Sequence, residues 1–361
     1  MQIPRSSKPT RALAVVAVGI GVGLALLRAE RERRGAAKRE PPPRRASLWP
    51  GEPSAEGVRR IVLEQLELAI ELLETDPREL DEEATVHELR KALKRARALL
   101  RLQRKLLGAR RFARESATLR DCGARLSGAR DAQVILDTLD TLVRRHPQQL
   151  AGKTGVTRLR AELLSERERA AGLGDPLLRR TVLDELQGVR ARMLAWQPRT
   201  HPDLLGASGH AGRAAQGPFE EGLKRLYRKG RRRRRRADRN PRIDNLHALR
   251  KSAKDLRYLA ETFDRSEDQA GSRRDDRATK RVRAVARRAD RLGELLGEDH
   301  DLALLAQTVR KRYKGKRGTR KTLLKLIARR RQRLRERALR DARRLYERKP
   351  GRFVRRLRGT L

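Results

Sequence analysis

The sequence predicts an all-α protein, and three observations support this fold class. From about Ser54 onward, apolar residues recur at helical spacing, as in "VRRIVLEQLELAIELLE". No run of alternating β-branched residues indicates a strand. A stretch rich in Pro, Gly and Ser, residues 197–218, divides the helical segments into two groups. Each group contains enough helices for a four-helix bundle.

The helical pattern locates each expected element. After the segment that begins near Ser54, we expect helices before the break near Thr85–Leu107, Arg111–Leu126, Asp131–Arg145, Val156–Ala171 and Pro176–Trp196. After the break we expect them near Phe219–Lys229, Ile243–Asp264, Arg277–Leu296, Asp301–Tyr313 and Thr319–Glu347. The expected organisation is an N-terminal segment and linker (1–53), a first bundle (54–196), a linker (197–218), a second bundle (219–348) and a basic tail (349–361).

The composition points to a polyanionic partner. Lys and Arg total 91 against 46 Asp and Glu, which gives a formal net charge of +45. Such an excess is typical of proteins that meet nucleic acid, an anionic membrane surface or a phosphate polymer. Aromatic residues make up only 3% of the chain, which argues against base stacking on single strands. The single cysteine, Cys122, excludes an intrachain disulfide and a multi-cysteine zinc site.

The N-terminal segment contains an uncharged apolar run, Ala12–Leu27, with basic residues on both sides. As a helix it reaches ~24 Å against a hydrocarbon core of ~30 Å, and flanking arginines can snorkel to the interfaces. We expect a single membrane anchor with the bulk of the chain in the cytoplasm, because more cations follow the run than precede it. The alternatives are a cleaved signal peptide and a cytoplasmic protein whose N-terminal segment is a non-membrane tail.

Two motifs occur twice in the chain. "HELRKALKRARALL", which begins at His87, is similar to "HALRKSAKDLRYLA", which begins at His247, at an offset of 160 residues. One helix later, "LSGARDAQVIL" is similar to "LGEDHDLALL", and Asp131 aligns with Asp301. The two groups of helices are therefore internal repeats.

Each histidine-headed segment, built as a helix, has one apolar and one cationic face. The apolar faces contain Leu89, Leu93, Ala96 and Leu100 in the first copy and Leu249, Ala253, Leu256 and Ala260 in the second. The cationic faces contain His87, Arg90, Lys91, Lys94, Arg97 and Arg101 in the first, and His247, Arg250, Lys251, Lys254, Arg257 with Tyr258 in the second. Like charges one turn apart repel, so this concentration has a cost that a bound anion would offset.

The pattern H-x-L-R-K-x-x-K-x-x-R, followed by L-G-x-x-x-D, resembles the conserved histidine α-helical domain, or CHAD, family. The second copy is the closer match, and the first departs from the pattern at Ser127, where the family usually has Gly. The resemblance covers roughly residues 54–348. It implies two pseudo-symmetric four-helix bundles around a basic central groove that binds inorganic polyphosphate. It also implies that the two cationic faces, Tyr258 included, form the ligand site.

For three features of the sequence, two interpretations remain open. His87 and His247 either contact the ligand or are structural groups where the bundles meet. Asp131 and Asp301 are expected as helix N-caps, the alternative being a metal site of "EDHD" with His247. The arginine run "RKGRRRRRRADR" is either a solvated, disordered segment or part of the anion-binding surface.

The functional prediction is a membrane-anchored, non-catalytic polyphosphate-binding module. We find no strand-borne Glu-x-Glu-x-Lys motif, no phosphate-cradling Gly-rich loop and no Ser/His/Asp arrangement, so no enzyme activity, cofactor or metal is expected. The alternative is a basic nucleic-acid-associated protein. A narrow groove between bundles suits a thin phosphate chain, whereas a duplex needs a broad surface or a groove-reading helix.

Overall fold

The computed structural model describes residues 47–49, 52, 54–76, 79, 81–126, 128–169, 173–197, 211–264 and 273–357. Side chains are described throughout these ranges except at 128–131, 211–218, 273–276 and 278. The expected anchor, Ala12–Leu27, lies outside the described residues. Within those residues, none of the helices combines the length and apolar character needed to cross a bilayer.

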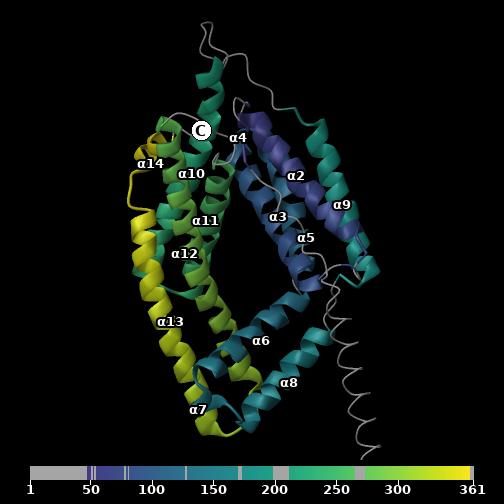
Figure 1. The fold of residues 1–361 in the computed structure, drawn as a ribbon, viewed down its shortest axis with the longest axis vertical. Helices are drawn as coiled ribbons and strands as arrows, with labels where there is room; N and C mark the ends of the chain where they lie inside the picture. Colours follow the sequence, from purple (N-terminus) through teal and green to yellow (C-terminus); the bar gives the residue numbers. More distant parts are fainter. Residues whose placement is uncertain are drawn as a thin grey trace, which may run out of the picture.

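The described part of the chain is all-helical, as predicted (Figure 1). Before the break the helices are α2 (Ser54–Glu74), α3 (Glu82–Leu102), α4 (Arg104–Leu107), α5 (Ala109–Arg125), α6 (Gly128–Arg145), α7 (Pro147–Leu150), α8 (Thr154–Arg169) and α9 (Pro176–Ala195). After it they are α10 (Ala211–Arg239), α11 (Ile243–Thr262), α12 (Arg273–Arg312), α13 (Arg317–Leu345) and α14 (Pro350–Leu357). The last of these forms within the stretch expected as a basic tail, and it buries Phe353, Val354 and Leu357.

Local signals explain where several helices begin. Asp81 caps α3 by accepting a hydrogen bond from the Ala84 amide at 2.9 Å. Asp175 caps α9 in the same way, accepting from the Leu177 amide at 2.9 Å, and Pro176 occupies the first helical position.

Both expected N-cap aspartates are instead inside helices, so that interpretation was wrong. Asp131 lies within α6, which begins at Gly128. Asp301 lies in the second half of α12, a continuous helix where the sequence suggested two helices divided near residue 297. The dividing stretch contains Gly297 but no proline, so every backbone amide can remain in the helical hydrogen-bond pattern.

The arginine run Arg231–Arg236 is also helical, which excludes the disordered alternative. It belongs to the C-terminal half of α10, a helix that begins within the expected linker. Gly222 brings α10 close to α3, since a Cβ at this position would lie 2.3 Å from the Leu102 carbonyl oxygen. Arg225 then donates to the Arg101 carbonyl at 2.6 Å, which caps the C-terminal end of α3. These contacts fix α10 against the first histidine-headed helix.

The buried apolar residues form two clusters that share α12. The larger one joins α2, α3, α5 and α9 to α10, α11, α14 and parts of α12 and α13. The smaller one joins α6, α7 and α8 to the C-terminal part of α12 and most of α13. In Figure 1, α6, α7 and α8 lie together at one end of the molecule, between the group α2, α3, α5, α9 and the group α10–α13. At 40 residues, α12 is ~60 Å long, enough to contribute to both clusters.

Because Leu305 of α12 is fully buried in the smaller cluster, Leu305→Ala should lower the free energy of unfolding by ~2–5 kcal/mol. Leu177→Ala is the matched control, since this leucine is 75% exposed and its truncation should change stability by less than ~0.5 kcal/mol. Urea denaturation followed by circular dichroism measures both. Equal midpoints for the two variants would contradict the assignment of Leu305 to a packed core.

Candidate anion-binding site

The two histidine-headed helices, α3 and α11, meet through two ion pairs. Arg101 pairs with Asp255 at 2.8 Å, and Arg95 pairs with Glu261 at 3.4 Å. The 160-residue offset of the repeat aligns Arg95 with Asp255 and Arg101 with Glu261. The second ion pair is therefore the repeat equivalent of the first with its charges exchanged. Around this contact, the α3–α11 pair has local twofold character.

The predicted division of each helix into two faces is confirmed on the apolar side. The apolar residues named for both copies are buried: Leu89, Leu93, Ala96, Leu100, Leu249, Ala253, Leu256 and Ala260. Of the polar set, His87 and Lys251 are exposed and Tyr258 is buried, whereas the remaining cations and His247 are half-buried. Half-buried positive charge is costly because burial removes part of its hydration.

One cavity of about 560 Å³ brings four of the predicted site residues together. His87 of α3 and Arg250, Lys254 and Arg257 of α11 line it, together with residues of α6, α12 and α13. The other eight predicted residues lie outside its lining: Arg90, Lys91, Lys94, Arg97, Arg101, His247, Lys251 and Tyr258. The cavity thus receives one residue of the first motif and three of the second.

Two glycines of α12 create the space for the α11 cations. A Cβ at Gly297 would lie 3.0 Å from Arg250 Nη2, and one at Gly293 would lie 3.6 Å from the Lys254 side chain. The glycine of the "LGEDHD" motif therefore has a packing role beside Arg250. Burial, followed by the charges of neighbouring Arg250 and Arg257, lowers the pKa of Lys254 to about 8. Burial also lowers the pKa of Arg250, against the opposing effect of Asp301.

The cavity lining is electrically mixed, which the sequence did not indicate. Its cations are Arg145, Arg250, Lys254, Arg257 and Arg330, and its carboxylates are Asp137, Asp290, Glu294, Glu298 and Asp301. Arg257 is ion-paired with Asp290. Glu298 pairs with Arg330 at 2.7 Å and with Arg145 at 2.9 Å.

Two carboxylates of "EDHD", those of Glu298 and Asp299, pair with arginines, and a metal ion bound there would have to compete with these ion pairs. Asp299 accepts from Arg331 at 3.0 Å and from Arg335 at 2.9 Å, and Glu298 is held by the two arginines just named. Among the described residues there is no group of three or more side chains arranged to hold a metal ion.

A second group of cations surrounds Asp255, where α3, α10 and α11 meet. The cations are Arg97 and Arg101 of α3 and Lys229 and Arg233 of α10. The pKa of the Asp255 carboxyl is raised, because the effect of burial exceeds the opposing effect of these four cations. Burial, followed by the charge of Arg101, lowers the pKa of Arg97 to about 10. The sequence left open whether the arginine run joins the anion-binding surface, because the run alone does not give the register of α10 relative to the histidine-headed helices.

His247 lies against His300, which the sequence analysis grouped with it only in the metal alternative. The ring centroids of His247 and His300 are 4.8 Å apart. Burial, then Lys251 and His300, lower the pKa of His247 to about 4, so the ring is neutral near pH 7. Tyr258 is buried beside Arg95, whose guanidinium carbon lies 5.9 Å from the ring centroid. Burial raises the pKa of the Tyr258 hydroxyl to about 12.

Comparison with known proteins agrees with this architecture. The family model of the CHAD domain matches residues 64–310, which is more than half of the chain, and the chain belongs to this family. No curated protein matches the sequence. The family assignment covers both histidine-headed helices and the "LGEDHD" motif.

The Lys254 pKa gives a direct test of this electrostatic picture. We expect the Lys254 ammonium to titrate near pH 8, below the usual lysine range, because it is buried beside two arginines. Carbon-13 NMR of labelled lysine side chains measures the titration, and Lys254→Met identifies the signal by removing it. A titration above pH 10 would show that Lys254 is hydrated like a surface lysine.

Proposed function

We propose that this CHAD-family protein binds inorganic polyphosphate, without catalysis, at the cations of α3 and α11. The observation that carries the proposal is that burial lowers the pKa of cations on both helices, among them Arg97 of α3 and Lys254 of α11. A cation with a lowered pKa lacks sufficient compensating negative charge nearby. A bound polyanion supplies that charge, and counterion release adds to the affinity.

The groove interpretation requires that both repeats face the same ligand. The local twofold character of the α3–α11 contact supports this arrangement, as do His87, Arg250 and Lys254 in one cavity. We further propose that the same twofold relates the two complete helical bundles. Polyphosphate presents no bases, so a site made of Lys and Arg with few aromatic residues suits it.

Membrane anchoring is a separate part of the proposal and is supported by the sequence alone. The apolar run Ala12–Leu27 has cationic flanks, and the linker "PPPRR" separates it from α2. With the anchor in the inner membrane, the CHAD domain would lie in the cytoplasm, where an anionic membrane surface could add contacts.

Neutralising two cavity cations should weaken polyphosphate binding. Arg250→Gln with Lys254→Gln should raise the dissociation constant of long-chain polyphosphate about tenfold or more, since charge-assisted hydrogen bonds of ~1.5–3 kcal/mol each are lost. The matched control is Lys321→Gln with Lys325→Gln, two exposed cations of α13 that are also four residues apart. Isothermal titration calorimetry at fixed salt measures all three proteins. An equal, small loss of polyphosphate affinity in both variants would show that only the net charge of the protein matters, and it would contradict the proposed site.

Binding should also depend on pH through Lys254. Its pKa of about 8 means that the ammonium is largely charged at pH 7 and largely neutral at pH 9 in the free protein. A bound polyanion favours the charged form, so affinity should fall about tenfold between pH 7 and pH 9. Lys254→Arg keeps the charge and should remove most of this fall. A pH profile that is the same in parent and variant would show that Lys254 does not face the ligand.

A further inference from the structure

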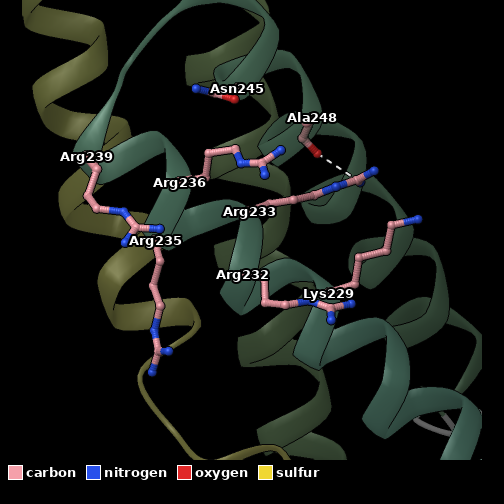
Figure 2. A pocket seen from close by; sticks show the side chains of 8 residues that line it. All are labelled: Lys229, Arg232, Arg233, Arg235, Arg236, Arg239, Asn245 and Ala248. Carbon is pink, nitrogen blue, oxygen red and sulfur yellow. Dashed lines mark hydrogen bonds between the residues drawn. The ribbon is translucent and has the colours of Figure 1, made fainter.

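A second cavity, of about 610 Å³, lies against α10 and the start of α11 (Figure 2). Six of its lining residues are cations: Lys229, Arg232, Arg233, Arg235, Arg236 and Arg239. Asn245 and Ala248 of α11 also line it, and the described lining residues include no carboxylate. This composition differs sharply from that of the first cavity, where acidic and basic residues are balanced.

The two cavities are separate. None of the described residues lines both of them. Ala248 in the second cavity and Arg250 in the first lie about 160° apart around the α11 helix axis at 100° per residue. A ligand in one cavity is therefore on the opposite side of α11 from a ligand in the other.

Helical geometry places four of the α10 cations on one narrow face. Lys229, Arg232, Arg233 and Arg236 fall within about 100° of the helix circumference and extend over a rise of about 10 Å. In Figure 2, Lys229, Arg233 and Arg236 extend from α10 toward the α11 side of the cavity. A row of this length is longer than one phosphate group needs and suits several linked phosphates.

Arg233 is held in place for such a ligand. Its Nη1 donates to the Ala248 carbonyl at 3.0 Å and to Ser252 Oγ at 2.9 Å. The guanidinium carries five N–H donors, so the Nε and Nη2 groups remain available beyond these two bonds. Burial, followed by Arg233, lowers the pKa of Lys229, which shows that the site is short of negative charge even with Asp255 nearby.

We propose that the cavity of Lys229, Arg232, Arg233 and Arg236 is a second anion site, independent of the first cavity, for a short chain of linked phosphates. The chemistry is that of a triphosphate: several oxygens at close spacing, contacted by arginine forks and a lysine point charge. The ligand is either free inorganic tripolyphosphate or the triphosphate of a nucleotide, since the described lining residues recognise charge and include no aromatic ring on which a base could stack.

The test uses the full chain and inorganic tripolyphosphate as the probe, with ATP and monophosphate as comparisons. Arg232→Glu with Arg236→Glu should raise the tripolyphosphate dissociation constant at least about tenfold. Both side chains are exposed, and reversing them reduces like-charge repulsion along α10, so the fold should survive. The milder Arg232→Gln with Arg236→Gln gives the same comparison should the reversal perturb the helix.

Two controls separate a local site from general charge. Lys321→Glu with Lys325→Glu changes the net charge equally at exposed positions four residues apart. They lie about 27–33 Å along α13 from Arg343, which pairs with Asp238 of α10. This control should keep tripolyphosphate affinity within about twofold of the parent. As the second control, Arg232→Glu with Arg236→Glu is also made in the Arg250→Gln/Lys254→Gln protein, where it should raise the dissociation constant by the same factor as in the parent, because separate sites contribute additively.

The outcomes are distinct. Loss of tripolyphosphate binding in the α10 variant, equal in both backgrounds and absent from the Lys321/Lys325 control, supports the second site, even where the first cavity proves not to bind polyphosphate. Equal loss in the Lys321/Lys325 control, or a loss that disappears in the Arg250/Lys254 background, overturns it. Monophosphate binding as tight as tripolyphosphate would also overturn the claim for linked phosphates, whereas the ATP measurement identifies the source of the chain.

Discussion

The structure depends on how it accommodates positive charge on its two central helices. α3 and α11 must contribute an apolar face to the core, yet their other faces carry Lys and Arg that are half-buried among neighbouring helices. The free energy of burying such charge has to be offset by carboxylates, by space for side chains to reach water, or by a bound anion. The structure uses carboxylates and space for the side chains. The lowered pKa values of Arg97, Arg250 and Lys254 indicate that these two features offset only part of the cost of burying the charge.

This constraint explains features that otherwise look unrelated. Asp255 and Glu261 on α11 pair with arginines of α3, which ties the two repeats together through their charges. Gly293 and Gly297 on α12 leave room for Lys254 and Arg250. Where carboxylates balance the cations, as in the first cavity, a ligand must compete with internal ion pairs. Along α10, where no carboxylate is among the described residues of the cavity lining, an external anion would not have to displace such ion pairs.

Much of this arrangement could be predicted from the sequence. The helical spacing of apolar residues predicted most of the helices and the apolar faces of α3 and α11. It could do so because burying one face of a helix makes Leu and Ala recur every three to four residues. Spacing did not reveal that α12 is continuous, since "GEDHD" combines polar residues with a glycine that usually interrupts a pattern. The reason for that glycine is the Arg250 side chain of another helix, which no local signal contains. The α10 cations were likewise visible only as a charge run, because their register against α11 depends on tertiary contacts such as Arg233 with Ala248.

The central claim is that these cations bind linked phosphates rather than nucleic acid. Competition measures it most directly: labelled long-chain polyphosphate, bound to the full chain at fixed salt, is displaced by unlabelled polyphosphate or by duplex DNA at equal phosphate concentration. The account predicts that polyphosphate displaces the label at a concentration at least about tenfold lower than DNA, since half-buried cations are accessible to a thin chain but not to a wide duplex. Displacement by DNA at an equal or lower phosphate concentration would contradict it.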